Sequence, residues 1–230
     1  MNLPPISERL KCALKYIEKG DVVADIGTDH AYLPIYLIES GIARAALASD
    51  VHEGPCESAR KHIAECGLSD KIEVRKADGL CGANADGQTD VIIAGMGGAL
   101  ICEILDKADF IKDKNIRLIL QPMRNVPDLR KYLLDNGFAI VNEALAAEDE
   151  RIYEIICAEF CGQKREYTPL SLLLGPKNIE NKKENAALFA AFCEKAASAL
   201  NKKICGMREG GQNASEQEAL LSLVLQEKEV

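Results

Sequence analysis

Long apolar segments are missing from this sequence. No stretch of its 230 residues reaches the roughly 18 apolar positions that a membrane-spanning helix needs. The opening segment, MNLPPISERLKCALKY, also lacks the apolar centre of a secretory signal. We therefore expect a cytoplasmic chain with no membrane partner.

Paired cysteines are missing as well. The chain has nine cysteines, an odd number, and no two of them have the C-x-x-C spacing of a zinc knuckle. We therefore expect no metal. Cysteines scattered among apolar neighbours, such as Cys102 in GALICEIL, are typical of small core residues in a reducing compartment.

Positive charge is in deficit. The chain has 28 basic and 36 acidic residues, and the net charge of −8 taken alone argues against a nucleic-acid partner. The deficit is uneven, because residues 164–230 carry ten basic and nine acidic side chains whereas residues 1–163 carry 18 and 27. The near-neutral C-terminal segment therefore leaves room for RNA.

Short apolar runs alternate with helical segments over the first two thirds of the chain. This alternation predicts an α/β fold with a parallel, doubly wound sheet. We expect strands at 22–26, 45–49, 71–76, 90–94 and 116–120, a loop at 81–88, and helices at 6–18, 31–40, 53–66, up to about 108, and 126–136. The overall composition, 47% hydrophobic and 28% charged, is that of a globular protein and excludes fibrous and disordered classes.

Two strands then follow each other with no helix between them. Residues 138–145 and 151–160 predict an antiparallel hairpin at the edge of the sheet. A plain nucleotide-binding fold does not end in this way. A parallel sheet with an antiparallel terminal strand is typical of Rossmann-like class I methyltransferases, and we expect residues 1–162 to form such a domain.

The rest of the chain, residues 163–230, predicts a separate helical unit. Residues 162–177 have the composition of a linker, and residues 179–205 and 216–229 are expected to be helices joined by a turn at 210–215. An apolar residue recurs every four positions along the first of these helices, at Leu188, Phe192, Ala196, Leu200 and Ile204. We expect a helical hairpin or short antiparallel coiled coil.

Acidic residues stand where the first three strands end, at the edge where open α/β sheets bind ligands. The first strand ends in Asp25-Ile26-Gly27-Thr28-Asp29, so the second glycine of a dinucleotide motif is replaced by a carboxylate that repels a pyrophosphate. The position suits a cationic, phosphate-free cofactor such as S-adenosylmethionine, and it disfavours a nicotinamide oxidoreductase. Asp50 can accept hydrogen bonds from ribose hydroxyls, and Asp78 from an adenine amino group, although each alone also fits a helix cap.

Glycines follow the fourth strand, in Ala94-Gly95-Met96-Gly97-Gly98, and allow a planar ligand to approach the backbone. The D/N-P-P-Y/F tetrapeptide of exocyclic-amine methyltransferases is absent at this place. After the fifth strand, Gln121 and Pro122 would wall the same pocket.

The segments DIGTDHAYLP, AGMGG followed by ALI, and LILQP together resemble the bacterial tRNA adenine-22 N1-methyltransferases. Ser7-x-Arg9-Leu10 and Gly54-Pro55 fit as well, and the resemblance covers residues 6–160 and the helical tail. It implies methyl transfer from S-adenosylmethionine to N1 of adenine 22 in tRNA. The implied cofactor site is Asp25, Gly27, Asp29, His30, Asp50 and Asp78, to which we add Gly79, Ala94 and Gly95. Two positions depart from the family pattern, Asp50, where glutamate is as common, and Met123, where asparagine is more usual.

The chemistry needs no general base, because N1 of neutral adenine carries a free lone pair. It needs alignment, exclusion of water, and groups that stabilise the developing positive charge. Asp29 and the backbone carbonyls around Gly95 and Gly97 are the catalytic candidates.

Substrate binding is expected on two surfaces. Tyr32, Met96, Gln121 and Pro122 would contact the base, which must first be exposed. In the tail, the basic candidates for the RNA backbone are Lys177, Lys182, Lys183, Lys202, Lys203 and Arg208. His30 and Tyr32 equally fit structural roles, and His52 and His62 fit the surface.

Three alternatives stay open. The tail could be a packing or dimerising hairpin in a monomer or weak dimer. The enzyme could methylate another RNA, a small molecule or a protein. The chain could also be a non-catalytic RNA-binding protein that keeps the fold.

Overall fold

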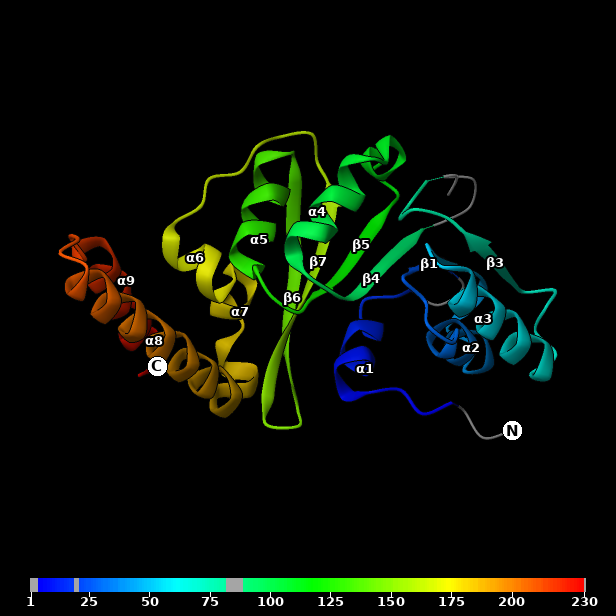
Figure 1. Cartoon of the computed structure of the whole chain (residues 1–230), viewed down its shortest axis with the longest axis horizontal. Coiled ribbons are helices and arrows are strands. Elements are labelled where there is room, and N and C mark those ends of the chain that lie inside the picture. Colours follow the sequence, from blue (N-terminus) through cyan, green and yellow to red (C-terminus); the bar gives the residue numbers. More distant parts are fainter. Residues whose placement is uncertain (1–3, 19–20, 82–88, 230) are drawn as a thin grey trace.

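The computed structural model describes residues 4–18, 21–81 and 89–229. Its centre is a seven-stranded sheet in the order β3-β2-β1-β4-β5-β7-β6 (Figure 1). The strands are β1 (Asp21–Ile26), β2 (Ala43–Asp50), β3 (Ile72–Lys76), β4 (Asp90–Met96), β5 (Arg117–Pro122), β6 (Phe138–Glu148) and β7 (Arg151–Phe160). Only the pairs that include β7 are antiparallel, which confirms the predicted class of sheet and its terminal hairpin.

Two groups of helices cover the two faces of the sheet. The helices α1 (Glu8–Leu14), α2 (Tyr32–Glu39) and α3 (Glu53–Glu65) pack on one face, and α4 (Gly98–Asp106) and α5 (Val126–Asp135) on the other. Alternate strand residues point to opposite faces, so Val23 belongs to the first core whereas Ala24 belongs to the second. The 3-10 helix η1 (Asp109–Lys112) leads into β5.

The tail is helical and lies at the opposite end of the molecule from α2 and α3 (Figure 1). It comprises α6 (Pro169–Leu174), α7 (Pro176–Glu180), the 3-10 helix η2 (Lys182–Asn185), α8 (Ala186–Glu209) and α9 (Ser215–Lys228). The helices α8 and α9 form the expected hairpin, and four of the five stripe residues of α8 are buried, with Leu188 half-buried.

Three local expectations were wrong. Residues 162–177 are not a plain linker, because Thr168 and Ser171 form a capping box that starts α6, with Pro169 in its first turn. The first helix is shorter than expected and ends at Leu14. Strand β4 runs two residues further than expected, through Gly95 to Met96. The loop expected at 81–88 lies outside the described residues apart from its first position.

A buried arginine joins the sheet to the start of the tail. Arg130 of α5 is fully buried, and its guanidinium donates to Glu143 Oε1 of β6 at 2.7 Å and to Glu154 Oε2 of β7 at 2.5 Å. It also donates to the Leu172 carbonyl of α6 at 2.9 Å. Glu143 Oε2 accepts the backbone N–H of Lys177 at 2.9 Å, so one network holds α5, β6, β7, α6 and α7.

No helix of the described chain is long and apolar enough to cross a membrane. Within the same residues, no group of three or more histidine, cysteine or acidic side chains could hold a metal ion.

Candidate cofactor and base site

The predicted strand-end residues meet at one edge of the sheet. The backbone N–H groups of Gly27 and Thr28 donate to the Ser49 carbonyl at 2.8 and 2.9 Å, which joins the ends of β1 and β2. In the same way, the N–H of Ala77 donates to the Asp50 carbonyl at 2.9 Å and joins β2 to β3. Parallel register therefore places the ends of β1, β2 and β3 along one edge of the sheet, as the sequence predicted.

The turn after β1 has little room. Gly27 has φ of +82°, and a Cβ at this position would lie 2.1 Å from Met96 Cε at the end of β4. Ala31 then adopts a left-handed conformation with φ of +57° directly before α2. Only glycine adopts the first conformation without strain, and its missing Cβ leaves room for the Met96 side chain.

Asp25 lies buried beneath this turn. Burial raises the pKa of its carboxyl to about 6, with a smaller opposing effect from a hydrogen bond with Thr28 and a further increase from the Asp50 charge. A cation placed beside Asp25 would favour its ionised form. The carboxylate is thus suited to a positively charged ligand group.

Asp29 and His30 differ in exposure. The Asp29 side chain is 79% exposed, and its Oδ2 lies 3.3 Å from His30 Nε2. The other imidazole nitrogen of His30, Nδ1, is buried and has no hydrogen-bond partner among the described residues. The rings of His30, Tyr32 and His62 lie with their centroids 5.4 Å apart in each pair. His62, which the sequence suggested was a surface residue, is therefore part of a ring cluster beside the site.

Gly95, near the end of β4, is held by Gln121. The Gly95 N–H donates to Gln121 Oε1 at 3.1 Å, and the Gln121 side chain is almost fully buried. Pro122 is buried too. Both residues were expected to face the substrate; in the structure both are buried, and Gln121 binds the Gly95 backbone. Gly97 precedes α4, and a Cβ there would lie 3.1 Å from Arg124 Nε.

A cavity of about 190 Å³ opens at this place. Helix α1, β4 and the turn after β1 line it with Arg9, Leu10, Asp25, Gly27, Thr28, Asp29, His30, Ala31, Tyr32, Leu33, Ala94 and Gly95. The sequence predicted seven of these twelve residues as site residues. The cavity lies at the carboxyl ends of β1 and β4, where the strand order reverses.

Sequence reasoning assigned no role to Arg9, the one lysine or arginine in this lining. Its Nη1 donates to Gln121 Oε1 at 3.0 Å, and its backbone N–H donates to Glu148 Oε2 at 3.1 Å. Its guanidinium carbon lies 5.3 Å from the centre of the Tyr153 ring. The motif Ser7-x-Arg9-Leu10 was visible in the sequence, but nothing local shows that α1 folds back onto the ends of β4 and β5.

The remaining predicted residues lie outside this cavity. Asp50 accepts the N–H of His52 at 2.8 Å, and Asp78 Oδ2 forms an ion pair with Lys107 at 2.6 Å. Gly79, with φ of +59°, packs closely against Ile104. All of them follow β2 and β3, beside the cavity along the same edge of the sheet.

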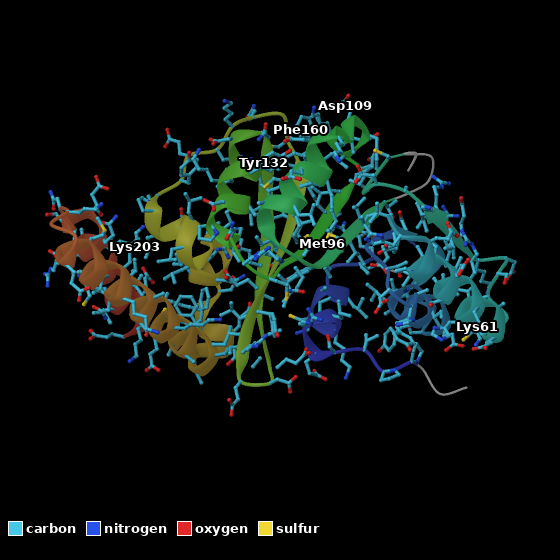
Figure 2. All side chains as sticks on the ribbon, viewed as in Figure 1. Lys61, Met96, Asp109, Tyr132, Phe160 and Lys203 are labelled. Carbon is cyan, nitrogen blue, oxygen red and sulfur yellow. The ribbon has the colours of Figure 1, made fainter. Side chains whose placement is uncertain are left out.

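The basic residues of the tail are far from the cavity, as Met96 and Lys203 show in Figure 2. Lys183, Lys202 and Lys203 are exposed. Lys182 differs, because its ammonium lies 2.8 Å from Glu227 Oε2 and its side chain is only 17% exposed. It therefore holds α9 and is poorly placed to contact RNA.

Residues 6–156 match the family model described as a methyltransferase domain. Fold and site together define a methyltransferase with a Rossmann-like sheet.

Comparison with individual proteins narrows this class. The curated tRNA (adenine(22)-N(1))-methyltransferase of Bacillus subtilis is 40% identical over 179 residues, which span 76% of this chain and 74% of that protein. The structure of Streptococcus pneumoniae Sp1610 in complex with S-adenosyl-L-methionine is similar with a TM-score of 0.83 and 35% identity, over 96% of this chain and 100% of the other. The M. capricolum tRNA methyltransferase TrmK, in complex with S-adenosyl-homocysteine, gives a TM-score of 0.81 and 28% identity over 97% and 98% of the two chains. The chain belongs to the family of tRNA (adenine(22)-N(1))-methyltransferases.

Proposed function

We propose that this protein transfers the methyl group of S-adenosylmethionine to N1 of adenine 22 in tRNA. The observation that carries the proposal is the cavity at the ends of β1 and β4, in a chain whose relative from Streptococcus pneumoniae binds this cofactor. The cavity combines a desolvated carboxylate with closely packed glycine backbone.

The residues present fit this cofactor. Asp25 offers negative charge beneath Gly27, where a cationic group gains most from it, and His30 Nδ1 offers an unpartnered polar atom. Asp50 would accept hydrogen bonds from the ribose, and Asp78 with Gly79 would hold the adenine. Ala94 and Gly95 would border the methionine end. When bound, the cofactor supplies an electrophilic methyl group on a sulfonium.

The target adenine would enter beside Tyr32 and Met96. Its N1 lone pair forms the new bond to carbon without prior loss of a proton, so the protein has to align the base and stabilise the positive charge that the ring acquires. Asp29 and the backbone carbonyls at Gly95 and Gly97 would do so. Gln121 contributes by fixing Gly95 through its hydrogen bond.

We assign residues 1–162 to the catalytic unit and residues 163–230 to a helical unit that binds tRNA through Lys183, Lys202 and Lys203. The chain would act in the cytoplasm as a monomer or weak dimer.

Methyl incorporation into unmodified tRNA tests this function. The wild-type protein is expected to incorporate tritiated methyl from S-adenosylmethionine, and Asp29→Ala is expected to fold normally and lose most of this activity. The exposed Asp29 side chain makes no contact that folding needs apart from its interaction with His30. Near-wild-type incorporation by Asp29→Ala would remove its assigned role, and a wild-type protein that binds the cofactor without methylating tRNA would remove the function.

A further inference from the structure

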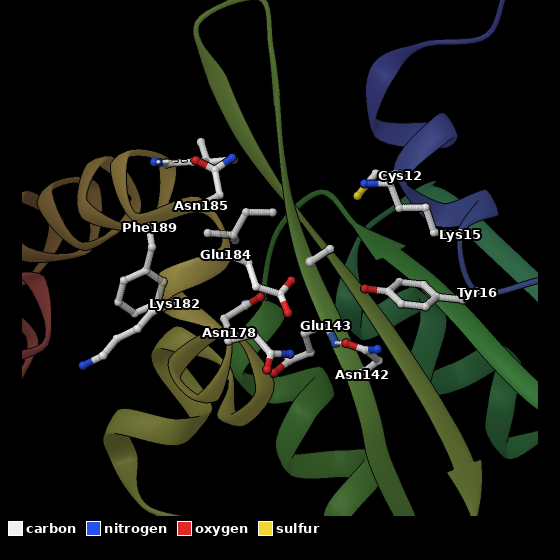
Figure 3. Close-up of a pocket in the computed structure, with 14 residues that line it drawn as sticks. Cys12, Lys15, Tyr16, Asn142, Glu143, Asn178, Lys182, Glu184, Asn185 and Phe189 are labelled. Carbon is white, nitrogen blue, oxygen red and sulfur yellow. Dashed lines mark hydrogen bonds between the residues drawn. The ribbon is translucent and has the colours of Figure 1, made fainter. Parts of the chain in front are cut away.

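A second and larger cavity lies between the sheet and the tail (Figure 3). Its volume is about 530 Å³, within the range of small-molecule sites. It is lined by Cys12 of α1 and by Lys15 and Tyr16 after that helix, from β6 by Asn142, Glu143, Ala144 and Leu145, and from the tail by Asn178, Asn181, Lys182, Glu184, Asn185, Leu188 and Phe189. None of these residues lines the cofactor cavity.

Several polar groups in this cavity have no partner. Within the described chain, the Lys15 ammonium, the Tyr16 hydroxyl, the Asn181 amide and the Glu184 carboxylate form no hydrogen bond or ion pair. In Figure 3 the Tyr16 hydroxyl and the Glu184 carboxylate point toward one another from opposite sides of β6. Burial and nearby negative groups, Glu184 among them, raise the pKa of Tyr16, so its hydroxyl stays protonated and can donate.

Two neighbouring charged side chains already form ion pairs with other residues. Glu143 binds the buried Arg130, and Lys182 binds Glu227. What the cavity offers a ligand is therefore a mixture: the unpartnered side-chain amide of Asn181 beside three partly bonded asparagine amides, one free carboxylate, one free ammonium, and the largely buried ring of Phe189.

This mixture fits a nucleobase. A carboxylate disfavours a phosphate group or another anion, and the amides disfavour an acyl chain. Amides pair with the mixed donor and acceptor edges of bases, carboxylates accept from base amino groups, and aromatic rings stack on bases that have left a helix.

The cavity is also adjacent to the path that RNA would take. Helix α1 and the residues directly after it line both cavities, with Arg9 and Leu10 of α1 at the cofactor site and Cys12 of α1, Lys15 and Tyr16 here. Lys15 follows Arg9 by six positions, about 9 Å at the rise of an α-helix, which is the length of about three stacked nucleotides.

We propose that this cavity receives one unstacked nucleotide of the tRNA, whose base presents an amino group to Glu184 and its edge to Asn181. The proposal rests on the proposed function, because the RNA bound here is the one methylated at the neighbouring site. Binding a second nucleotide would fix the register in which the target adenine enters.

The test compares steady-state constants for Glu184→Gln, Asn181→Ala and their combination. The KM for tRNA is expected to rise about tenfold in Glu184→Gln, because a neutral amide replaces the charge-assisted acceptor, and further in the double variant, because Asn181→Ala removes its hydrogen-bonding group. The kcat and the KM for S-adenosylmethionine are expected to stay unchanged. Glu216→Gln is the matched control, because it removes an exposed, unpaired tail carboxylate outside the cavity.

Whether the KM for tRNA rises or falls in Glu184→Gln distinguishes recognition of a base by Glu184 from simple repulsion between Glu184 and the RNA. If Glu184 were merely an acidic group near RNA, its removal would lower the KM for tRNA, as in any loss of repulsion. An unchanged or lower KM in Glu184→Gln overturns the proposal while wild-type methylation stands. Titration of the wild-type protein with adenosine and guanosine monophosphates shows whether the ligand is a free nucleotide instead. Tight binding of these nucleotides, together with an unchanged KM for tRNA in Glu184→Gln, assigns the cavity to a free nucleotide and also overturns the proposal. A wild-type protein inactive on tRNA overturns the proposed function instead.

Discussion

Asp25 is a carboxyl group that folding removes from water before a ligand is present. Its pKa of about 6, against an ordinary value of 3.8, means that the folded protein holds this proton more tightly than the unfolded chain does. The contribution to stability is therefore present below pH 3.8 and is lost as the pH rises through 6. A cationic ligand reverses this disadvantage, because it stabilises the ionised form.

Cofactor affinity should accordingly depend on pH. We expect S-adenosylmethionine to bind more weakly as the pH falls below about 6, by at most about tenfold per pH unit, because Asp25 must first lose its proton. Calorimetric titration between pH 5 and 7 measures this. Asp25→Asn should bind weakly with a flat profile, whereas His30→Gln, which replaces the neighbouring imidazole, should keep the slope. A wild-type affinity that is constant over this range contradicts the assignment.

Part of the site could be predicted from single residues, and part could not. Asp25, Gly27 and Asp29 could be predicted to lie at the cavity because the sequence shows where the first strand ends, and parallel strands place their ends along one edge. Arg9 was not assigned, since its position depends on α1 packing across the sheet. The inward direction of Gln121 was missed for a similar reason: a residue at a strand end can face the ligand or the backbone beside it, and its partners Gly95 and Arg9 come from other elements.

Apolar patterns in the sequence predicted the larger elements. Short continuous apolar runs indicated the strands of the parallel sheet, longer segments with a helical pattern indicated the main helices, and the fold class was confirmed. The six-residue α6 is too short for such a pattern. Its only local signal is Thr168-Pro169 followed by Ser171, which reads equally well as part of a loop.

The Arg130 network is expected to hold the tail against the sheet. Replacing Arg130 with Met leaves Glu143, which is fully buried, and Glu154, which is 12% exposed, without their cation, and this should cost about 3–5 kcal/mol in the free energy of unfolding. Urea denaturation measures the loss. Arg208→Met breaks the exposed ion pair with Glu218 and should change stability little. Equal effects of the two substitutions would contradict the account of this network.

At the scale of the whole molecule, the net charge of −8 is unevenly distributed between the sheet region and the tail. Some of the acidic residues stand at strand ends, where they suit a cationic cofactor. The tail is nearly neutral and exposes Lys183, Lys202 and Lys203. A tRNA that reached from the cofactor cavity to the tail would place its phosphates beside these lysines.

Salt dependence should report this contact. Lys203→Ala is expected to weaken tRNA binding and to reduce the slope of log affinity against log salt by about 0.7 to 0.9, the value for one phosphate contact. Lys61→Ala is the control, because Lys61 lies on α3 at the other end of the molecule (Figure 2) and is similarly exposed. Binding measured over a salt series distinguishes them. Identical slopes for the two variants would favour a tail that only packs or dimerises.

The position of the methyl group tests the central claim most directly. Unmodified tRNA is incubated with the protein and S-adenosylmethionine, digested, and mapped by mass spectrometry, beside the same tRNA with guanine at position 22. The account predicts 1-methyladenosine at position 22 in the first tRNA and no methylation of the second. Methylation at another position or on another atom of adenine, or equal incorporation into both tRNAs, would contradict it.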